Sequence, residues 1–191
     1  MKKVCVFTGA AAGINPAYRE AAFQLGQMIG SRSLGLVYGG GKRGLMGAVA
    51  DGVLAVNGRV TGIIPQFLDN VEVGHKGVTD LHIIDSMHER KAMMYDMADA
   101  FIIFPGGLGT LDETMEIITW RQLGLHTKPI IIVNLNGYWD LMLAMFKNII
   151  DQGFMHHGHT GHFDQANDLD SLMDKLDAIF RPDETSIERQ P

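Results

Sequence analysis

The chain has 191 residues, 46% of them hydrophobic, which is enough to fill one domain and too few for two. Its formal net charge of −6 provides no basic face for nucleic acid or an anionic membrane, so we expect neither partner and any phosphate site must be local. The single cysteine, Cys5, excludes an internal disulfide. We expect a cytoplasmic protein, because the N-terminal residues do not show the pattern of a signal peptide and no run of about 18 apolar residues occurs.

Short β-branched apolar segments alternate with segments of helical period along residues 1–180. In chain order they predict strand Val4–Thr8, helix Pro16–Ser31, strand Leu34–Tyr38, helix Leu45–Asn57, strand Arg59–Ile64, strand Leu81–Ile84, helix Ser86–Ala98, strand Ala100–Phe104, helix Thr110–Leu123, strand Pro129–Asn134, helix Tyr138–Gln152 and helix Leu169–Phe180. The alternation predicts a single-domain α/β, Rossmann-like fold over residues 1–180, with helices on both faces of a parallel sheet. A polar C-terminal tail, residues 181–191, follows it.

Two of the predicted helices carry a start signal. Ser86 with Glu89, and Thr110 with Glu113, have the spacing in which a side-chain oxygen and a carboxylate satisfy free amides of a first helical turn. We therefore predict that these helices begin beside Ser86 and Thr110.

Three glycine-rich loops follow predicted strands, where an open parallel sheet binds its ligands. They are Gly9–Gly13, Gly39–Gly44 and Gly106–Thr110. Glycine lets backbone amides approach a phosphate, and the next helix adds positive charge at its N-terminus, although a tight turn alone also explains each loop. The second loop matches G-x-G-x-x-G, but neither the acidic ribose contact of a dinucleotide site nor the Gly-Lys-Ser/Thr of a P-loop follows. The pattern favours a mononucleotide.

Two charged residues lie on largely apolar helix faces. Arg90 falls on the methionine-rich stripe of its helix, so it should meet a protein carboxylate or a ligand phosphate, unless it merely extends to solvent at the helix edge. Glu113 shares a face with Ile117 and Trp120 beside a predicted phosphate loop, which favours a functional carboxylate over a residue that only caps the helix. The segment His156–His162 matches no familiar metal-ligand spacing and is interpreted as a polar surface loop, so we expect no metal site.

Taken together, these motifs resemble the LOG family of cytokinin riboside 5′-monophosphate phosphoribohydrolases. The segments Met87-His88-Glu89-Arg90-Lys91 and Pro105-Gly106-Gly107-Leu108-Gly109-Thr110-Leu111-Asp112-Glu113 match its R-K pair and its P-G-G-x-G-T-x-x-E pattern, and the segment 38–47 is similar to its other glycine segment. Members of this family have also been labelled lysine decarboxylases.

The resemblance implies residue roles. Arg90 and Glu113 match the family's catalytic pair. The implied substrate contacts are Glu72, Lys91, Gly107, Leu108, Gly109, Thr110, Thr119, Gly40 and Gly41. The implied reaction, part of cytokinin biosynthesis, is hydrolysis of a purine nucleoside 5′-monophosphate to free base and ribose 5-phosphate, with no cofactor and no metal. AMP and an N6-prenylated nucleotide remain equally open as substrates.

Two rival functions remain. The first is a non-catalytic module that binds or carries an AMP-like nucleotide on the same loops. The second is a decarboxylase, which would need a Schiff-base lysine holding pyridoxal phosphate.

We also expect a two-fold homodimer. The helix Thr110–Leu123 has one apolar face with Leu111, Met115 and Ile118 and another with Ile117 and Trp120, whereas a helix on a sheet needs only one such face. A partner subunit, joined through this helix or Ser86–Ala98, would cover the second face. The resemblance implies the same assembly, because short LOG members are homodimers.

Overall fold

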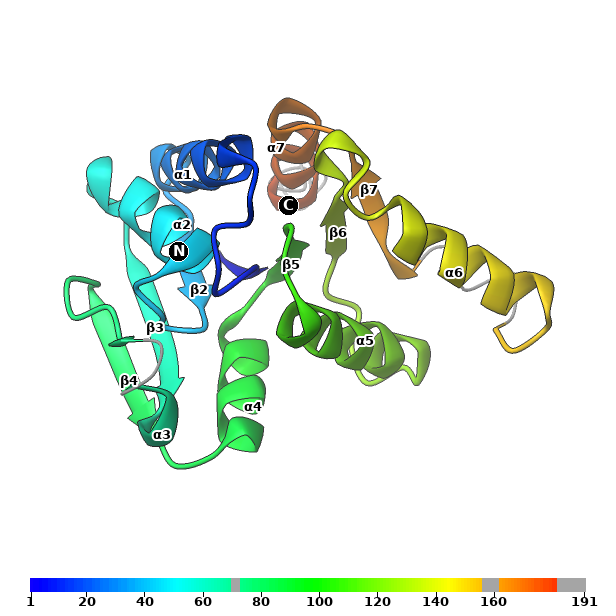
Figure 1. The fold of residues 1–191 in the computed structure, drawn as a ribbon, viewed down its shortest axis with the longest axis horizontal. Helices are drawn as coiled ribbons and strands as arrows, with labels where there is room; N and C mark the ends of the chain where they lie inside the picture. The colour runs from blue at the N-terminus through cyan, green and yellow to red at the C-terminus, as the bar shows by residue number, and fades with distance from the viewer. Residues whose placement is uncertain (70–72, 156–161, 182–191) are drawn as a thin grey trace, which may run out of the picture.

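A computed structural model of the chain describes residues 1–69, 73–155 and 162–181. Over these residues, seven parallel strands form one sheet in the order β4-β3-β2-β1-β5-β6-β7 (Figure 1). They are β1 (Lys3–Phe7), β2 (Gly35–Tyr38), β3 (Val60–Pro65), β4 (Asp80–Ile84), β5 (Ala100–Ile103), β6 (Ile130–Val133) and β7 (Asp164–Ala166). In the centre of the sheet, Val4 of β1 lies opposite Leu36 on one side and Ala100 on the other.

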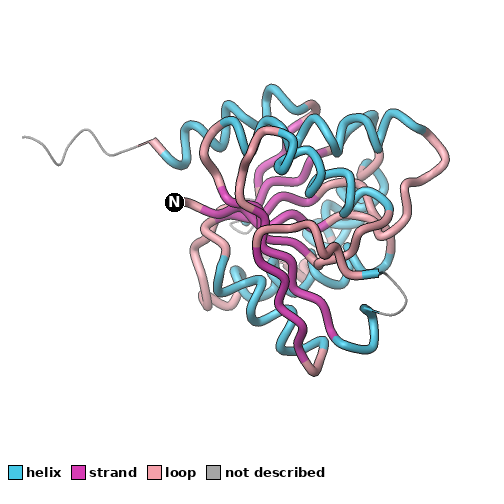
Figure 2. The backbone as a smooth tube through the Cα atoms, turned by 90° about the vertical axis from the view of Figure 1, so that its left-hand side faces the viewer, coloured by secondary structure: helices cyan, strands magenta, loops and turns pink. Residues whose placement is uncertain are grey.

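Helices cover both faces of the sheet, so the predicted α/β fold is confirmed (Figure 2). One layer contains α1 (Pro16–Ser31), α2 (Gly44–Ala55) and α7 (Leu169–Phe180); the other contains α4 (Met87–Met97), α5 (Leu108–Gln122) and α6 (Asp140–Asp151). The short α3 (Gln66–Leu68) follows β3. None of the helices in the described part of the chain has the length and apolar character that crossing a membrane requires.

The sheet separates two apolar cores because successive side chains of a strand point to opposite faces. On β1, Val4 and Val6 pack into the core under α1, α2 and α7, whereas Cys5 and Phe7 pack into the core under α4, α5 and α6. Burial raises the pKa of the Cys5 thiol well above its usual value, so the thiol stays neutral. Cys5 is therefore a core residue.

The helix starts differ in one important case from the sequence prediction. Ser86 caps α4 as predicted, with its Oγ accepting from the Glu89 amide at 3.2 Å, although the Glu89 carboxylate accepts from the Asp85 amide instead of closing the box on Ser86. The prediction that Thr110 caps α5 is wrong. The helix begins at Leu108 with Gly107 as its N-cap, so Thr110 belongs to the first turn and Glu113 lies one turn further along.

Two shorter elements also differ from the prediction. Strand β7 has only three residues and lacks a clear apolar signal, so the sequence did not reveal it. The helix predicted from Tyr138 starts two residues later, as α6 at Asp140, and the 3-10 turn Leu135–Gly137 precedes it. The tail 182–191 and residues 156–161 of the histidine segment lie outside the described residues.

Candidate active site

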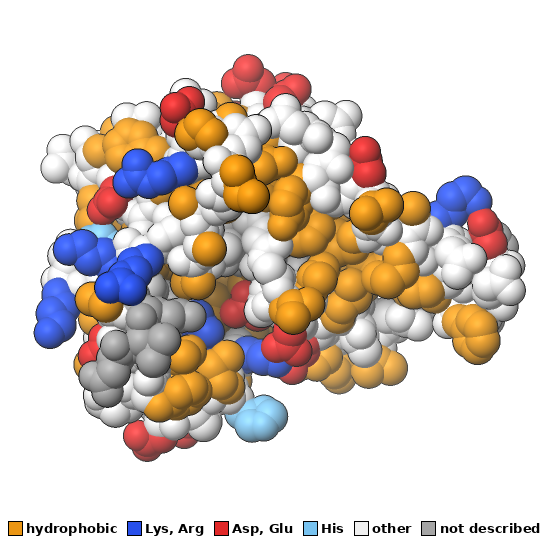
Figure 3. All heavy atoms as spheres, in the orientation of Figure 1, with side chains coloured by type: hydrophobic (Ala, Val, Ile, Leu, Met, Phe, Trp, Pro, Cys, Tyr) orange, Lys and Arg blue, Asp and Glu red, His pale blue; other side chains and the backbone are white. Residues whose placement is uncertain are grey.

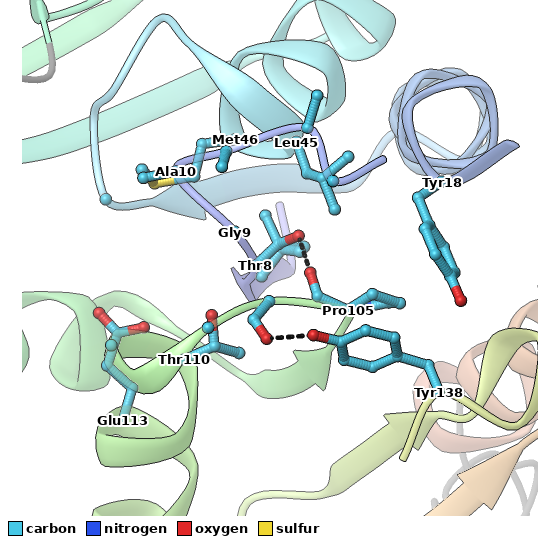
Figure 4. Close-up of a pocket in the computed structure, with 18 of the residues that line it drawn as sticks. Thr8, Gly9, Ala10, Tyr18, Leu45, Met46, Pro105, Thr110, Glu113 and Tyr138 are labelled. Atoms are coloured by element: carbon cyan, nitrogen blue, oxygen red, sulfur yellow. Dashed lines mark hydrogen bonds between the residues drawn. The ribbon is translucent and has the colours of Figure 1, made fainter. Parts of the chain in front are cut away.

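The strand order places a cleft at the carboxyl ends of the strands. The chain first adds β2, β3 and β4 on one side of β1, and then adds β5, β6 and β7 on the other side. The loops after β1 and β5 therefore diverge, which is where open α/β sheets bind ligands. A cleft of about 770 Å³ lies there, lined by the loop Gly9–Asn15, the loop Pro105–Gly107 and the first turns of α2 and α5 (Figure 4). Its volume is typical of a small-molecule site.

The loop after β5 presents a helix N-terminus to this cleft. Thr8 Oγ1 donates to the Pro105 carbonyl at 2.9 Å, and the Gly9 amide donates to the same oxygen at 3.1 Å, which ties the two loops together. Gly106 must be glycine here, because a Cβ would collide with the Thr110 hydroxyl. The first-turn amides of α5 have no carbonyl one turn earlier to pair with, so this end of the helix suits an anion.

Arg90 and Glu113 meet inside the cleft from different helices. Arg90 on α4 is 6% exposed and Glu113 on α5 is 9% exposed. Arg90 donates through Nε to the Ile63 carbonyl at 3.3 Å and through Nη2 to the Gly39 carbonyl at 3.0 Å, and its Nη1 lies 4.0 Å from Glu113 Oε1. The two charges thus stabilise each other across a gap longer than a hydrogen bond.

Gly39 is the residue that makes room for this guanidinium. It directly follows β2, and a Cβ there would collide with Arg90 Nη2 and approach the sulfur of Met46. The sequence prediction singled out the neighbours Gly40 and Gly41 for substrate contact, yet Gly39 is the member of the segment that lines the cleft. A glycine-rich pattern cannot distinguish these positions, because the selection depends on where a distant arginine lies.

The other end of the cleft is aromatic. Tyr138 Oη donates to the Gly106 carbonyl at 2.6 Å, and its ring meets that of Tyr18 edge-on at a centroid distance of 5.5 Å. Figure 4 shows both tyrosines on the side of the cleft away from Glu113. Sequence reasoning missed both residues, because they come from α1 and from the segment after β6 and carry no local motif.

The structure brings together five of the site residues predicted from the sequence and leaves the others outside the cleft lining. Lining the cleft are Arg90, Gly107, Gly109, Thr110 and Glu113. Outside it lie Leu108, which is 84% exposed, Thr119, exposed further along α5, and Gly40 and Gly41. Glu72 lies outside the described residues.

Lys91 is held away from the cleft by two carboxylates. Its Nζ lies 2.8 Å from Asp112 Oδ2 and 3.3 Å from Glu116 Oε2. Burial lowers the pKa of Lys91, but the hydrogen bonds and charges of Asp112 and Glu116 outweigh it and raise the pKa overall. A Schiff-base lysine needs a lowered pKa, and among the described residues the cleft lining contains no lysine. The decarboxylase interpretation therefore has no support in this cleft.

Fold and cleft together define a class: a doubly wound α/β protein whose switch-point cleft combines an anion-binding helix N-terminus with a buried acid–guanidinium pair. A family model described as "Possible lysine decarboxylase" matches residues 46–176. The chain is 44% identical over 92% of its length to the probable cytokinin riboside 5′-monophosphate phosphoribohydrolase LOGL9 of Oryza sativa subsp. japonica, covering 78% of that protein. It is also 44% identical over 81% of its length to the cytokinin riboside 5′-monophosphate phosphoribohydrolase LOG7 of Arabidopsis thaliana, covering 71% of it.

The chain therefore belongs to the LOG family, as the motifs had indicated. Among solved structures, the molybdenum cofactor binding protein of Rippkaea orientalis aligns with a TM-score of 0.73 over 94% of this chain and 98% of its own. Its sequence identity is 22%, so this likeness concerns the fold alone.

Proposed function

We propose that the chain is a nucleoside 5′-monophosphate phosphoribohydrolase, which hydrolyses the N-glycosidic bond of adenine or N6-substituted adenine nucleotides. The observation that carries this proposal is the pair Arg90 and Glu113, buried in the cleft beside the N-terminus of α5. The names of the two relatives at 44% identity support the same reaction. In the plant relatives' names the substrate is a cytokinin nucleotide, so we place this chain in cytokinin biosynthesis.

The proposed mechanism assigns each group one task. The 5′-phosphate binds the first-turn amides of α5, at Gly109 and Thr110. Water attacks the ribose C1′, the bond from C1′ to the base breaks, and the base leaves with a proton. Glu113 stabilises the positive charge that develops on the ribose and orients or deprotonates the water. Arg90 orients the ribose or phosphate and assists the departing base. No cofactor or metal takes part.

The remaining sequence-predicted contacts stay part of this proposal. Gly107 belongs to the phosphate loop, and Gly40 and Gly41, which lie outside the cleft lining, stay proposed substrate contacts. Lys91, Leu108 and Thr119 lie outside the cleft lining and are proposed to contact the nucleotide in an assembly or ligand-bound state that brings them to the cleft. Glu72, which lies outside the described residues, stays a proposed substrate contact.

Incubation of the purified protein with AMP tests the reaction. We expect free adenine and ribose 5-phosphate in equal amounts by chromatography. Parallel assays with isopentenyladenosine monophosphate measure the preference for the N6 substituent. Intact nucleotides in both assays would contradict the proposed activity.

The alternative function is a non-catalytic nucleotide-binding or carrier module. The observation that favours it is the shared fold of a solved structure named a molybdenum cofactor binding protein. Binding of AMP by calorimetry without release of adenine would establish this alternative.

We further propose a cytoplasmic homodimer whose contact includes α4 or α5 and buries more than about 1,000 Å². Within the chain, Trp120 of α5 packs edge-on against Tyr95 of α4, so part of the second apolar face is covered internally. Figure 3 shows apolar side chains gathered over the α5 and α6 side of the molecule, and the exposed large apolar residues of these helices are Leu108 on α5 and Leu141 and Met145 on α6. Light scattering that gives a monomer at micromolar concentration would contradict the dimer.

A further inference from the structure

A histidine and an aspartate lie behind the glycine segment that carries Gly39. His75 is buried in the segment after α3, and Asp51 lies on α2. The two side chains meet at 2.9 Å between His75 Nε2 and Asp51 Oδ1. Neither lines the cleft, and the mechanism above uses neither.

The hydrogen bonds of His75 define its proton position. Its Nδ1 accepts from the Gly77 amide at 3.2 Å, so in the neutral ring Nε2 carries the proton and donates to Asp51. Nδ1 thus closes a turn within the segment that carries His75, and Nε2 connects that segment to α2.

The segment held in this way pairs with the glycine segment after β2. The His75 amide donates to the Gly40 carbonyl at 2.9 Å, the Lys42 amide donates to the Val73 carbonyl at 3.0 Å, and Gly41 forms an isolated antiparallel bridge with Gly74. Gly40 has a φ of +78°, and a Cβ there would press on the backbone of Ile63. The glycine segment is therefore held between β3 and the segment of His75.

Arg90 depends on the same piece of backbone. Its Nη2 donates to the Gly39 carbonyl, and its Nε donates to the Ile63 carbonyl, so the direction of the guanidinium follows these two oxygens. The Gly39 carbonyl belongs to the peptide that continues into Gly40, whose own carbonyl accepts from His75. A shift at His75 would therefore reach Arg90 through two consecutive peptide groups.

We propose that the Asp51–His75 pair is a positioning device for Arg90, which holds the Gly39 carbonyl where the guanidinium can face Glu113. His75 and Asp51 are positioning residues, because they act through the backbone and do not touch the cleft. The kinetic consequence rests on the proposed phosphoribohydrolase function, whereas the structural consequence for Arg90 does not.

Four variants separate this role from general stabilisation. His75→Ala removes the tie, while His75→Gln restores a donor near the position of Nε2. Asp168→Ala is the matched control. It removes the N-cap of α7, where Asp168 Oδ1 accepts from the Ser171 amide at 2.7 Å, and Asp168 lies outside the cleft lining. Asp51→Ala removes the same hydrogen bond by changing the half-exposed partner, and it replaces His75→Ala in the experiment if His75→Ala does not fold.

The first readout is the Arg90 Nη–H resonance in a nitrogen-15 spectrum, assigned with Arg90→Lys, because Nη2 is the nitrogen that donates to the Gly39 carbonyl. We expect its exchange with solvent to become at least about tenfold faster in His75→Ala and Asp51→Ala, and to stay near the wild-type rate in His75→Gln and Asp168→Ala. An unchanged resonance in a folded His75→Ala or Asp51→Ala protein would overturn the proposal, whatever the activity.

The second readout is steady-state hydrolysis of AMP. We expect kcat to fall about tenfold or more in His75→Ala while KM changes by less than about threefold, because the Arg90 guanidinium is displaced but not removed and the phosphate subsite on α5 is untouched. His75→Gln should recover most of kcat, and Asp168→Ala should keep it despite a lower melting temperature. Equal loss of kcat in Asp168→Ala would mean that destabilisation alone explains the effect and would also overturn the proposal. If the wild-type protein hydrolyses no nucleotide, the proposed function fails, and the resonance alone decides on the positioning role.

Discussion

Replacing Glu113 with glutamine removes one charge from the cleft and leaves the shape of the side chain nearly unchanged. We place the positive charge that develops on the ribose about 4 Å from the Glu113 carboxylate. At this distance their attraction contributes about 4 kcal/mol at an effective dielectric constant of 20. The burial of Glu113, at 9% exposed, makes that dielectric appropriate. Since each 1.36 kcal/mol changes a rate tenfold, we expect kcat to fall by about two to three orders of magnitude.

The structure also predicts what this variant retains. Arg90 keeps its hydrogen bonds to Ile63 and Gly39, so the fold and the binding of AMP should persist. Single-turnover release of adenine measures the rate, and calorimetry measures binding. Glu116→Gln is the control, because it makes the same chemical change one turn along α5 at a side chain that pairs with Lys91 outside the cleft. A Glu113→Gln protein with kcat near that of Glu116→Gln would refute the catalytic assignment.

Three further predictions follow from the same contacts. Arg90→Ala should weaken AMP binding and lower kcat together; a lower melting temperature with unchanged kinetics would make Arg90 a purely structural ion-pair partner. Gly39→Ala should displace the Arg90 guanidinium, so both kcat and the melting temperature should fall, and a variant with wild-type kinetics would contradict the close approach seen here. Burial, together with the charges of Arg121 and Lys128, lowers the pKa of His126. The unfolded chain therefore binds this proton first, and the free energy of unfolding should decrease as the pH falls below about 6.5, with a shallower dependence in His126→Gln. Urea denaturation at several pH values measures this free energy, and the same change with pH in both proteins would show that His126 contributes nothing.

Local sequence patterns predicted those features that depend on neighbours in the chain. The period of the apolar residues located α1 and α7 at their observed bounds, and Ser86 was correctly predicted as the cap of α4. The same kind of pattern failed at Thr110, because Gly107 can adopt the extended cap conformation three residues earlier and the helix starts there. The spacing of Thr110 and Glu113 therefore does not decide whether the helix begins at Leu108 or at Thr110.

The sequence by itself determined the alternation of strands and helices, the burial expected of Arg90 and the glycine-rich motifs that resemble one family. Those properties follow from side-chain periodicity and from the few residue types that permit close backbone approach. Only the tertiary structure decided that Arg90 faces Glu113 at 4.0 Å, that Gly39 rather than Gly40 lines the cleft, and that Tyr18 meets Tyr138 at its far end. Each of these contacts joins residues that are more than 20 positions apart in the chain, and their geometry depends on the strand order and on how the helices pack on the sheet, which no local pattern encodes.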